Sequence, residues 1–282
     1  MRRFRKIIRQ WAIPPGLWDL MSNAYSRLKR KQQPPAEITS LLEENKLLLD
    51  RHKGKRCFIL GAGSSIAKQD LKKLAGEYVI SVSNTYVHPD YPLLKPQYHV
   101  LPPILSGHDK LYSKEQFAEW LKEMDQKTLG AEMFFHIGDK TLIDANGLFE
   151  NRIIHWNEYC PWDESCNFTL DLARVPQIWS VSEYAIEVAL YLGFEKIYLL
   201  GFDHDWFNGP LVYFYDHKTQ HVLKPSEEKL KFADAEFQMR RHAYIFKKYK
   251  CLYRIKENIY NANANPNHYL DVFPKVNFES LF

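Results

Sequence analysis

The sequence has no apolar run of about 18 residues, the length that indicates a membrane-spanning helix. It also lacks a secretory apolar segment near its amino terminus, so we expect no membrane-spanning segment and a cytoplasmic location. Its four cysteines form no CxxC pair, which argues against a zinc site. Because Cys57 and Cys251 lie in apolar, strand-like runs, we expect buried free thiols in a reducing compartment.

Positive charge is concentrated near the amino terminus. The formal net charge is only +4, yet residues 1–33 contain nine Lys or Arg and one acidic residue, Asp19. A helix over residues 1–13 would have an apolar face of Phe4, Ile7, Ile8 and Trp11 and a basic face of Arg2, Arg3, Lys6 and Arg9. This pattern predicts a peripheral helix in an anionic membrane interface, on the inner face of the cell membrane. The alternative is a basic helix docked on its own domain or on a partner subunit.

The segment 178–207 predicts a helix, a turn and a buried strand. Ser180 and Glu183 have the spacing of a capping box, and Gly193 suits the left-handed position after the helix. Residues 196–200 are almost continuously apolar, as expected of a central parallel strand. Asp203, His204 and Asp205 follow this strand, and ligands of open α/β sheets bind at the carboxyl ends of strands.

A glycine-rich turn follows the first predicted strand, residues 56–60. The turn consists of Gly61, Ala62, Gly63, Ser64 and Ser65, and we expect a helix over about 66–74 after it. Such a turn presents backbone N–H groups to a phosphate, although it is neither a complete GxGxxG nor followed by a Walker lysine. The alternative is a tight turn without a ligand. Asn84, after a strand over 78–83, could bind a base or ribose or could cap a turn.

The remaining pattern alternates strands with helices. We expect helices over 37–51, 114–126 and 226–248, strands over 98–101, 131–135 and 251–255, and irregular structure over 137–177. This alternation predicts a mostly parallel, doubly wound α/β sheet with helices on both faces. The expected domains are a basic helical arm and linker, residues 1–52, and an α/β catalytic domain, residues 53–282.

With these motifs in order, residues 55–260 resemble the bacterial lipooligosaccharide sialyltransferases and the wider sialyltransferase-like family. The resemblance rests on the turn 61–65, on Asn84, on segments 180–182, 189–193 and 201–203, and on Tyr213 to Asp216. It implies a CMP-activated sugar as donor, first choice sialic-acid- or Kdo-like, and a glycan or lipid-linked acceptor. The nucleotide site it implies consists of Gly61, Ala62, Gly63, Ser64, Ser65, Asn84, Ser180, Val181, Ser182 and Asp203, and Tyr213 would meet the leaving phosphate.

The sequence departs from the family pattern at two places. Ala62 and Ser64 replace the Asn and Pro of the family's turn. Residues 231–234 lack the His that serves as general base in the family. The donor could therefore differ, and the candidates for the general base are His204, Asp205 and His217. The alternative for His217 is a solvated loop residue.

Two other functions stay open. A related pyrophosphokinase-type enzyme would hold Mg²⁺ or Mn²⁺ between Asp203 and Asp205, provided that the strand geometry extends that far. A non-catalytic nucleotide-binding protein is the other alternative. We expect metal-independent sugar transfer, no nucleic-acid partner, and leave the choice between monomer and homo-oligomer open.

Overall fold

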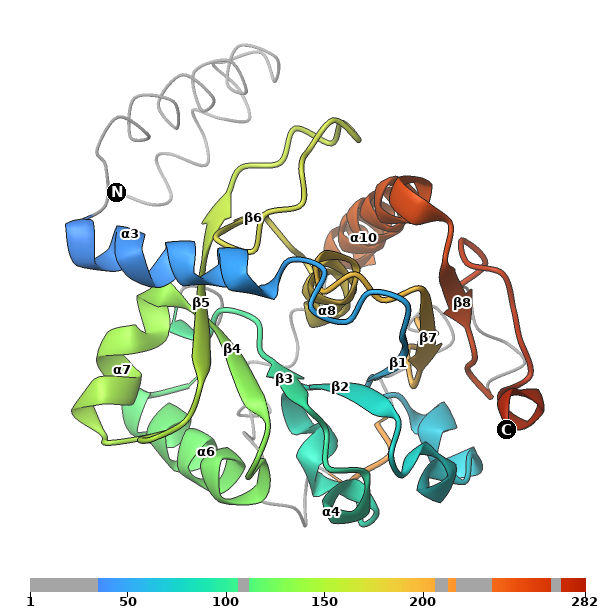
Figure 1. The fold of residues 1–282 in the computed structure, drawn as a ribbon, viewed down its shortest axis with the longest axis horizontal. Helices are drawn as coiled ribbons and strands as arrows, with labels where there is room; N and C mark the ends of the chain where they lie inside the picture. Colours follow the sequence, from blue (N-terminus) through green and yellow to red (C-terminus); the bar gives the residue numbers. More distant parts are fainter. Residues whose placement is uncertain (1–34, 106–111, 206–212, 217–234, 265–269) are drawn as a thin grey trace. The chain divides into compact units, whose positions relative to one another are not determined.

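The computed structural model describes residues 35–105, 112–205, 213–216, 235–264 and 270–282. The chain divides into a unit of residues 1–40 and a unit of residues 41–282. In the described part of the second unit, one parallel sheet is formed by eight strands (Figure 1). They are β1 (Arg56–Leu60), β2 (Tyr78–Val82), β3 (Tyr98–Val100), β4 (Glu132–His136), β5 (Ile154–Cys160), β6 (Arg174–Pro176), β7 (Lys196–Leu200) and β8 (Ile259–Asn261).

The strand order contains a change of direction beside β1. The order is β6-β5-β4-β3-β2-β1-β7-β8, so the chain moves outward from β1 to β6 and then returns to the other side of β1. Leu60 at the end of β1 is paired with Leu200 at the end of β7. In open α/β sheets this switch point is where ligands bind, at the carboxyl ends of the strands. The predicted parallel, Rossmann-like α/β fold is confirmed.

Helices connect the strands and cover the sheet. The α-helices are α3 (Ala36–Glu43), α4 (Tyr91–Leu94), α6 (Lys114–Lys127), α7 (Lys140–Ala145), α8 (Val181–Tyr191) and α10 (Ala235–Lys256). The 3₁₀ turns are η1 (Glu44–Leu48), η2 (Ser64–Lys68), η3 (Leu71–Leu74), η4 (Ser83–Val87), η5 (Ile137–Asp139) and η7 (Phe278–Leu281). No described helix is both long enough and apolar enough to cross a membrane.

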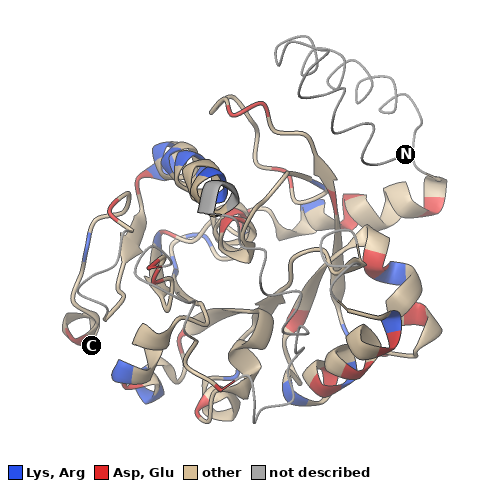
Figure 2. Cartoon of the chain, turned by 180° about the vertical axis from the view of Figure 1, so that it is seen from behind, with Lys and Arg blue, Asp and Glu red and all other residues tan. Residues whose placement is uncertain are grey.

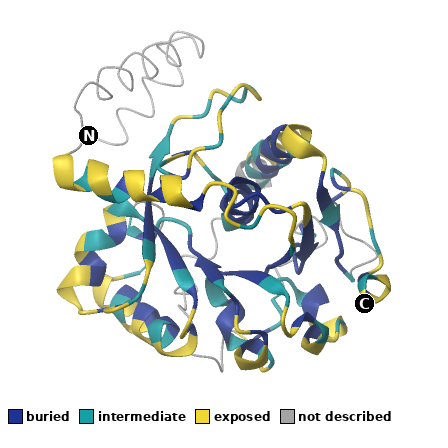
Figure 3. Ribbon diagram, in the orientation of Figure 1, coloured by how far each residue is buried: buried dark blue, intermediate teal, exposed yellow. Residues whose placement is uncertain are grey.

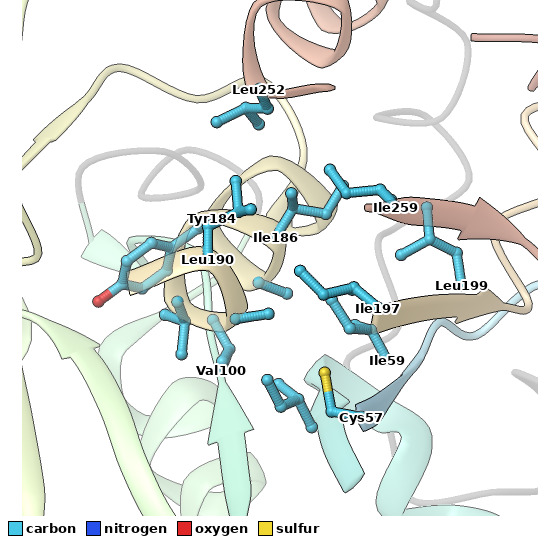
Figure 4. Close-up of a cluster of buried hydrophobic side chains, with 14 of the residues drawn as sticks. Cys57, Ile59, Val100, Tyr184, Ile186, Leu190, Ile197, Leu199, Leu252 and Ile259 are labelled. Carbon is cyan, nitrogen blue, oxygen red and sulfur yellow. The ribbon is translucent and has the colours of Figure 1, made fainter. Parts of the chain in front are cut away.

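The two faces of the sheet have separate apolar cores. Cys57 and Ile59 of β1 pack with α8 and α10 on one face (Figure 4), whereas Phe58 and Leu60 pack with η2 and η3 on the other. Since successive residues of β1 alternate between the two cores, the strand is apolar throughout. Ten of the eleven residues of α8 are buried, so this helix forms the centre of its face (Figure 3).

Two predicted helices are wrong in part. The segment expected as a helix over 66–74 forms the short turns η2 and η3, and Asp70 caps the second by accepting the N–H of Lys72. The helix expected over 37–51 ends at Glu43 and continues as η1, which leaves Leu47 80% exposed. Residues 41–52, assigned from the sequence to the arm, include Leu48 of the main core.

The segment 137–177 is not irregular, because it contains α7, β5 and β6. The strand β5 has the polar residues His155 and Asn157 among its buried positions, which obscured its pattern. The amide nitrogen of Asn157 is satisfied there by donating to the Phe135 carbonyl at 2.8 Å and to the Tyr184 hydroxyl at 2.9 Å. A buried strand can carry polar residues when neighbouring elements supply their partners.

The carboxyl-terminal predictions also need correction. Residues 251–255, expected as the last strand, belong to α10, and the last strand is β8. Cys251 forms a disulfide with Cys166, so the expectation of free thiols holds for Cys57 and Cys160 but not for this pair. The first part of the helix expected over 226–248 and residues 1–34 of the amino-terminal arm lie outside the described residues.

Candidate active site

The loops after β1 and β7 meet in direct backbone contact. The N–H of Gly61 donates to the Leu200 carbonyl at 2.7 Å, and the N–H of Gly63 donates to the Gly201 carbonyl at 2.8 Å. A Cβ atom on Gly61 would lie 2.4 Å from the Gly201 oxygen, and one on Gly201 would lie 2.5 Å from the Gly61 oxygen. Gly201 also has a φ of +70°, which disfavours other residues. The chain therefore needs glycine at both positions to close the switch point.

The buried side chain of Asp203 packs against the glycine-rich turn and holds it by a hydrogen bond. Its side chain is 4% exposed, and Oδ2 accepts the backbone N–H of Ser65 at 2.9 Å. A Cβ atom on Gly63 would lie 2.6 Å from the same oxygen, so the carboxylate is packed against the turn. Three N–H groups of the turn, those of Gly61, Gly63 and Ser65, are therefore donated within the protein. This arrangement fixes the shape of the turn and reduces its capacity to bind a phosphate directly.

The segment 213–216 lies against this turn. Tyr213 forms an antiparallel bridge with Gly63, and the N–H of Phe214 donates to the Ala62 carbonyl at 3.2 Å. The rings of Tyr213 and Tyr215 stack with centroids 5.1 Å apart and planes at 10°. The sequence motif 213–216 and the turn 61–65 are thus brought together. They make an aromatic wall beside the switch point.

Asn84 joins the same group of residues through its amide. Its Nδ2 donates to the hydroxyl of Tyr215 at 3.0 Å, and its Oδ1 accepts the indole N–H of Trp120 at 2.8 Å. Both ends of the amide are engaged, so the immediate effect of Asn84 is to orient Tyr215. Burial raises the pKa of both Tyr213 and Tyr215, so each hydroxyl remains protonated and can donate a hydrogen bond near neutral pH.

The amino terminus of α8 forms the other side of the site. The predicted capping box is confirmed: Ser180 caps the helix, and Oε2 of Glu183 accepts the N–H of Ser180 at 2.6 Å and that of Trp179 at 2.8 Å. Ser180 and Val181 are half-buried, and Ser182 is buried. The hydroxyl of Ser182 donates to that of Ser180 at 2.7 Å. The first turn of the helix therefore presents Ser180 as its accessible hydroxyl.

A chain of hydroxyl groups connects Ser180 to His204. The Tyr249 hydroxyl, from α10, donates to Ser182 Oγ at 2.5 Å and lies 2.9 Å from Nε2 of His204. His204 is 5% exposed and has a φ of +49°, which turns its side chain away from the extended path of β7. His204 is therefore buried below the surface of the site. It could serve as general base only through the hydroxyl groups of Tyr249 and Ser182.

Buried charges stabilise this region. Burial raises the pKa of Glu183 to about 7, partly offset by Lys248. Lys248, fully buried, lies 2.7 Å from Glu187 and donates to the Pro176 carbonyl at 2.6 Å. Arg241 donates to the Trp179 carbonyl at 2.9 Å and interacts electrostatically with Tyr213 and Glu183, although burial lowers its pKa. A guanidinium group is thus placed between the helix start and the aromatic wall.

The pair Asp203 and Asp205 does not fit a DxD metal site in this conformation. The strand β7 ends at Leu200, and the positive φ values of Gly201 and His204 interrupt the alternation that would align the two carboxylates. Asp203 is committed to Ser65, whereas Asp205 is half-exposed. Within the described ranges, no group of three or more His, Cys, Asp or Glu is arranged to hold a metal ion. Metal independence itself stays a prediction, and His217 lies outside the described residues.

Several residues of the site were missed from the sequence. Tyr249 and Arg241 lie in a charged helix whose polar composition gave no reason to single them out. Asn263, after β8, accepts the N–H of Phe202 at 3.0 Å and donates to its carbonyl at 2.9 Å, so it holds the segment before Asp203. The sequence signal that could have identified Asn263 was the polar run directly after the last strand. Trp120 is spaced as an ordinary core residue of α6.

A cavity of about 800 Å³ is found elsewhere, on the side of η4, α4 and the end of α6. Its lining includes Tyr86, Pro92, Lys95, Lys127 and Leu129. It shares no residue with the group at the switch point. The connected polar groups, rather than this cavity, therefore define the candidate site.

The chain has a similar solved structure but no matching sequence family. No family model and no curated protein sequence matches the chain. Among solved structures, the chain is similar to the sialyltransferase CstII from Campylobacter jejuni in complex with a substrate analogue, cytidine-5'-monophosphate. The sequences are 18% identical, the TM-score is 0.43, and the match covers 79% of this chain and 85% of that chain.

Proposed function

We propose that this protein is a glycosyltransferase that takes a nucleotide-activated sugar as donor and extends a cell-surface glycan. A CMP-linked, sialic-acid- or Kdo-like sugar is the first choice for the donor. The observation that carries the proposal is the meeting of five separate segments, 61–65, Asn84, 180–182, 201–205 and 213–215, at the switch point of a parallel sheet. They are joined there by hydrogen bonds through Asp203, Tyr215 and Tyr249.

Donor binding would use the groups that the fold leaves around this point. Because the turn 61–65 donates three of its N–H groups internally, the phosphate would be met by the Tyr213 hydroxyl, by Ser180 and by the positive end of α8. Arg241 adds a positive charge beside these groups. The stacked rings of Tyr213 and Tyr215 provide the flat apolar surface suited to a base or a sugar ring.

Sugar transfer would break the bond between the anomeric carbon and the phosphate oxygen and form one to the acceptor hydroxyl oxygen. The leaving phosphate takes the bonding electrons, and donors already in position stabilise its charge. The acceptor hydroxyl must lose a proton to a base within hydrogen-bond reach. Among the described residues, Asp205 is half-exposed at this edge and is a candidate for that base. His204 would act only through the Tyr249, Ser182 and Ser180 hydroxyls, which would have to reverse the direction in which they donate for the proton to reach its Nε2.

The proposal is tested by calorimetric titration of the full chain with CMP, UDP, GDP and ATP. We expect CMP to bind most tightly, and Arg241→Gln to weaken its binding in a variant that thermal unfolding shows to be still folded. A matched control is Arg240→Gln, the neighbouring residue on the exposed side of the same helix. Binding of ATP alone, with phosphate transfer that stops in EDTA, would instead favour the pyrophosphokinase-type alternative.

Turnover is then measured as release of the nucleotide from CMP-sugars, with and without lipid-linked glycan acceptors. We expect acceptor-dependent release that continues in EDTA. Tight nucleotide binding without release on any acceptor would leave the non-catalytic alternative. We also propose that the protein works at a membrane surface, since residues 1–33 combine nine Lys or Arg with Phe4 and Trp11.

A further inference from the structure

The cavity of about 800 Å³ beside η4, α4 and the end of α6 has no part in the candidate active site. Its volume lies in the range of sites that bind a small molecule. It nevertheless adjoins the active site, because the turn η4 contributes Asn84 to the site and Tyr86 to the cavity. His88, another lining residue, contacts Phe214 with ring centroids 5.1 Å apart. A chain-like molecule held in the cavity could therefore reach the switch point.

The walls of the cavity are mainly apolar and rigid. Pro89, Pro92 and Pro96 line it, and each proline fixes its own backbone angle. The ring of Tyr86 is 3% exposed and so is held in place, whereas Leu129 is 74% exposed. A ligand that covered Leu129 would remove this apolar side chain from water. The walls therefore suit a ring-shaped ligand that has an apolar face, such as a sugar.

His88 supplies a hydrogen-bond donor to the cavity. Its Nδ1 accepts the backbone N–H of Asp90 at 3.2 Å, and burial lowers the pKa of the imidazole. Near neutral pH the ring is therefore neutral, and its single hydrogen is on Nε2. Gln97 offers no such group, because its Oε1 accepts the N–H of Val79 at 2.7 Å and its Nε2 donates to a backbone carbonyl.

The charge in the lining is positive. Among the described residues that line the cavity, none is Asp or Glu, and two are Lys. Lysines of α6 alternate with acidic residues (Figure 2), and Lys127 is paired with Glu123 at 2.8 Å. Lys95 follows α4, which has no charged residue, and no described group accepts a hydrogen bond from its ammonium. Lys95 therefore gives the cavity a positive charge that the described chain does not pair.

The backbone at Lys95 does not explain why a lysine is present there. The residue has a φ of +44° and a ψ of 61°, and its N–H donates to the Tyr91 carbonyl at 3.2 Å to end α4. This left-handed position after a helix is usually glycine or asparagine, because a side chain destabilises it. The lysine is thus retained at some cost to the fold, which points to a use for its side chain.

The end of α6 does not repel an anion from the cavity. The last carbonyl groups of a helix carry partial negative charge, which would disfavour an anion nearby. In this protein Nη2 of Arg152 donates to the Thr128 carbonyl at 2.7 Å and to the Ala131 carbonyl at 2.8 Å. An internal cation therefore offsets the negative charge at this end of α6.

We propose that the cavity binds a sugar that carries a carboxylate or a phosphate group. The ammonium of Lys95 would pair with the anion, Nε2–H of His88 would donate to an oxygen of the sugar, and the apolar walls would cover the ring. The bound sugar would be a distal unit of the glycan that is extended at the switch point. This role rests on the proposed function, whereas the binding itself needs no donor sugar. A nucleic acid would require more than one such cation.

The test titrates the full chain with glucuronic acid, glucose 6-phosphate and glucose, and follows binding by saturation-transfer nuclear magnetic resonance. The two acids distinguish a carboxylate from a phosphate, and glucose is the neutral control. Lys95→Gln removes the cation, and Lys196→Gln is its control, at an exposed position where β7 begins. Leu129→Asp places a negative charge in the lining, and Leu129→Asn is its neutral control.

We expect at least one acid to bind more tightly than glucose. Lys95→Gln should weaken that binding about 10- to 100-fold, the loss of one hydrogen bond to a charged group, and Lys196→Gln should bind as the wild type does. Leu129→Asp should bind more weakly than Leu129→Asn. Lys95→Gly should lose binding as Lys95→Gln does without a lower urea midpoint of unfolding, because glycine suits the left-handed backbone.

Four results would overturn the proposal: equal binding of glucose and the acids, no binding of any of the three, unchanged binding in Lys95→Gln, or a lowered unfolding midpoint in Lys95→Gly that accounts for its loss of binding. Competition between the acid and CMP would place the sugar in the donor site and would also overturn it. Failure of CMP to bind would count against the proposed function alone. Binding of an acid that depends on Lys95 would still support the cavity as a site.

Discussion

The hydroxyl oxygen of Tyr249 lies 2.5 Å from that of Ser182, which ties the middle of α10 to the first turn of α8. The same hydroxyl is 2.9 Å from Nε2 of His204. One side chain therefore connects the loop after β7 to the capped helix start where the donor is proposed to bind. All three groups are buried, so removing the central hydroxyl leaves polar atoms without compensation from water.

Tyr249→Phe is therefore expected to lower the free energy of unfolding by about 1–3 kcal/mol, measured by urea denaturation. The control is Tyr253→Phe, the same chemical change one turn later on α10, where the half-buried ring packs against Phe273. If the hydroxyl chain also conducts a proton in catalysis, Tyr249→Phe shifts the pH profile of turnover while Tyr253→Phe does not. Equal losses of stability in the two variants would contradict the importance of the chain.

The contact between Gly61 and Gly201 gives a second prediction. Gly201→Ala places a Cβ atom 2.5 Å from a backbone oxygen at a φ of +70°. Gly130→Ala is the control, because Gly130 has a similar φ of +88° but no atom within 4 Å of its Cβ position. We expect both variants to lose about 1–2 kcal/mol from the backbone conformation, and Gly201→Ala to lose about 1–3 kcal/mol more from the clash. Equal denaturation midpoints for the two variants would show that the loops after β1 and β7 can move apart without loss of stability.

The parallel α/β class and the elements on either side of the switch point could be predicted from the sequence because local signals agreed there. The buried strand β7, the capping box at Ser180 and the glycine-rich turn each have a pattern that depends on neighbours in the chain. Segments stabilised by distant partners could not be recognised in this way. Asn157 reads as a loop residue until Phe135 and Tyr184 are placed beside it.

The contributions of Tyr249 and Asn263 show the same limit at the site. Tyr249 contacts Ser182, 67 residues away, and Asn263 binds Phe202, 61 residues away. No spacing rule connects positions so far apart in sequence. The disulfide between Cys166 and Cys251 is a third case, since a run that looked like a strand is part of a helix facing a distant loop.

This disulfide closes a separation of 85 residues and joins the segment after β5 to α10. Reduction with dithiothreitol should lower the free energy of unfolding by about 2–4 kcal/mol, because the unfolded chain gains conformational entropy. The double variant Cys166→Ser with Cys251→Ser should show the same loss and no further response to the reductant. Cys160→Ser is the control and should respond as the wild type does. If the reductant leaves the wild type unchanged, the pair contributes nothing to stability.

His99 predicts a loss of stability in acid. Burial lowers its pKa from 6.5 to about 3, so the folded protein holds it neutral beside Ser81, whose Oγ lies 2.7 Å from Nδ1. A group with a depressed pKa stabilises the fold above its unfolded value, and this stability is lost as the pH falls from about 6.5 toward 3. We expect His99→Gln to be less stable near neutral pH and to lose less stability in acid than the wild type. Parallel stability curves for the two proteins would contradict this assignment.

The contribution of Glu183 to stability changes with pH in the opposite direction to that of His99. The two contributions can therefore be measured separately. Burial raises its pKa from 4.5 to about 7, so its contribution to stability is complete below about 4.5 and is lost as the pH rises through about 7. Glu183→Gln keeps an oxygen that can accept the N–H groups of Trp179 and Ser180 but cannot ionise. The variant should therefore gain on the wild type as the pH rises, by an amount on the order of a few kcal/mol.

The measurement is the difference in unfolding free energy between Glu183→Gln and the wild type, followed from acid to mildly alkaline pH. Taking the difference cancels His99, whose effect falls at lower pH and is common to both proteins. Lys248, Arg241 and Glu187 act electrostatically on Glu183, and all three are present in both proteins. Burial also raises the pKa of Glu187, which titrates in both proteins. Glu119→Gln, at an exposed position of α6, is the control for the loss of one carboxylate. A flat difference for Glu183→Gln would show that folding leaves the pKa of the capping carboxylate at its unfolded value. A difference of the opposite sign would show that Lys248 and Arg241 outweigh its burial and lower that pKa.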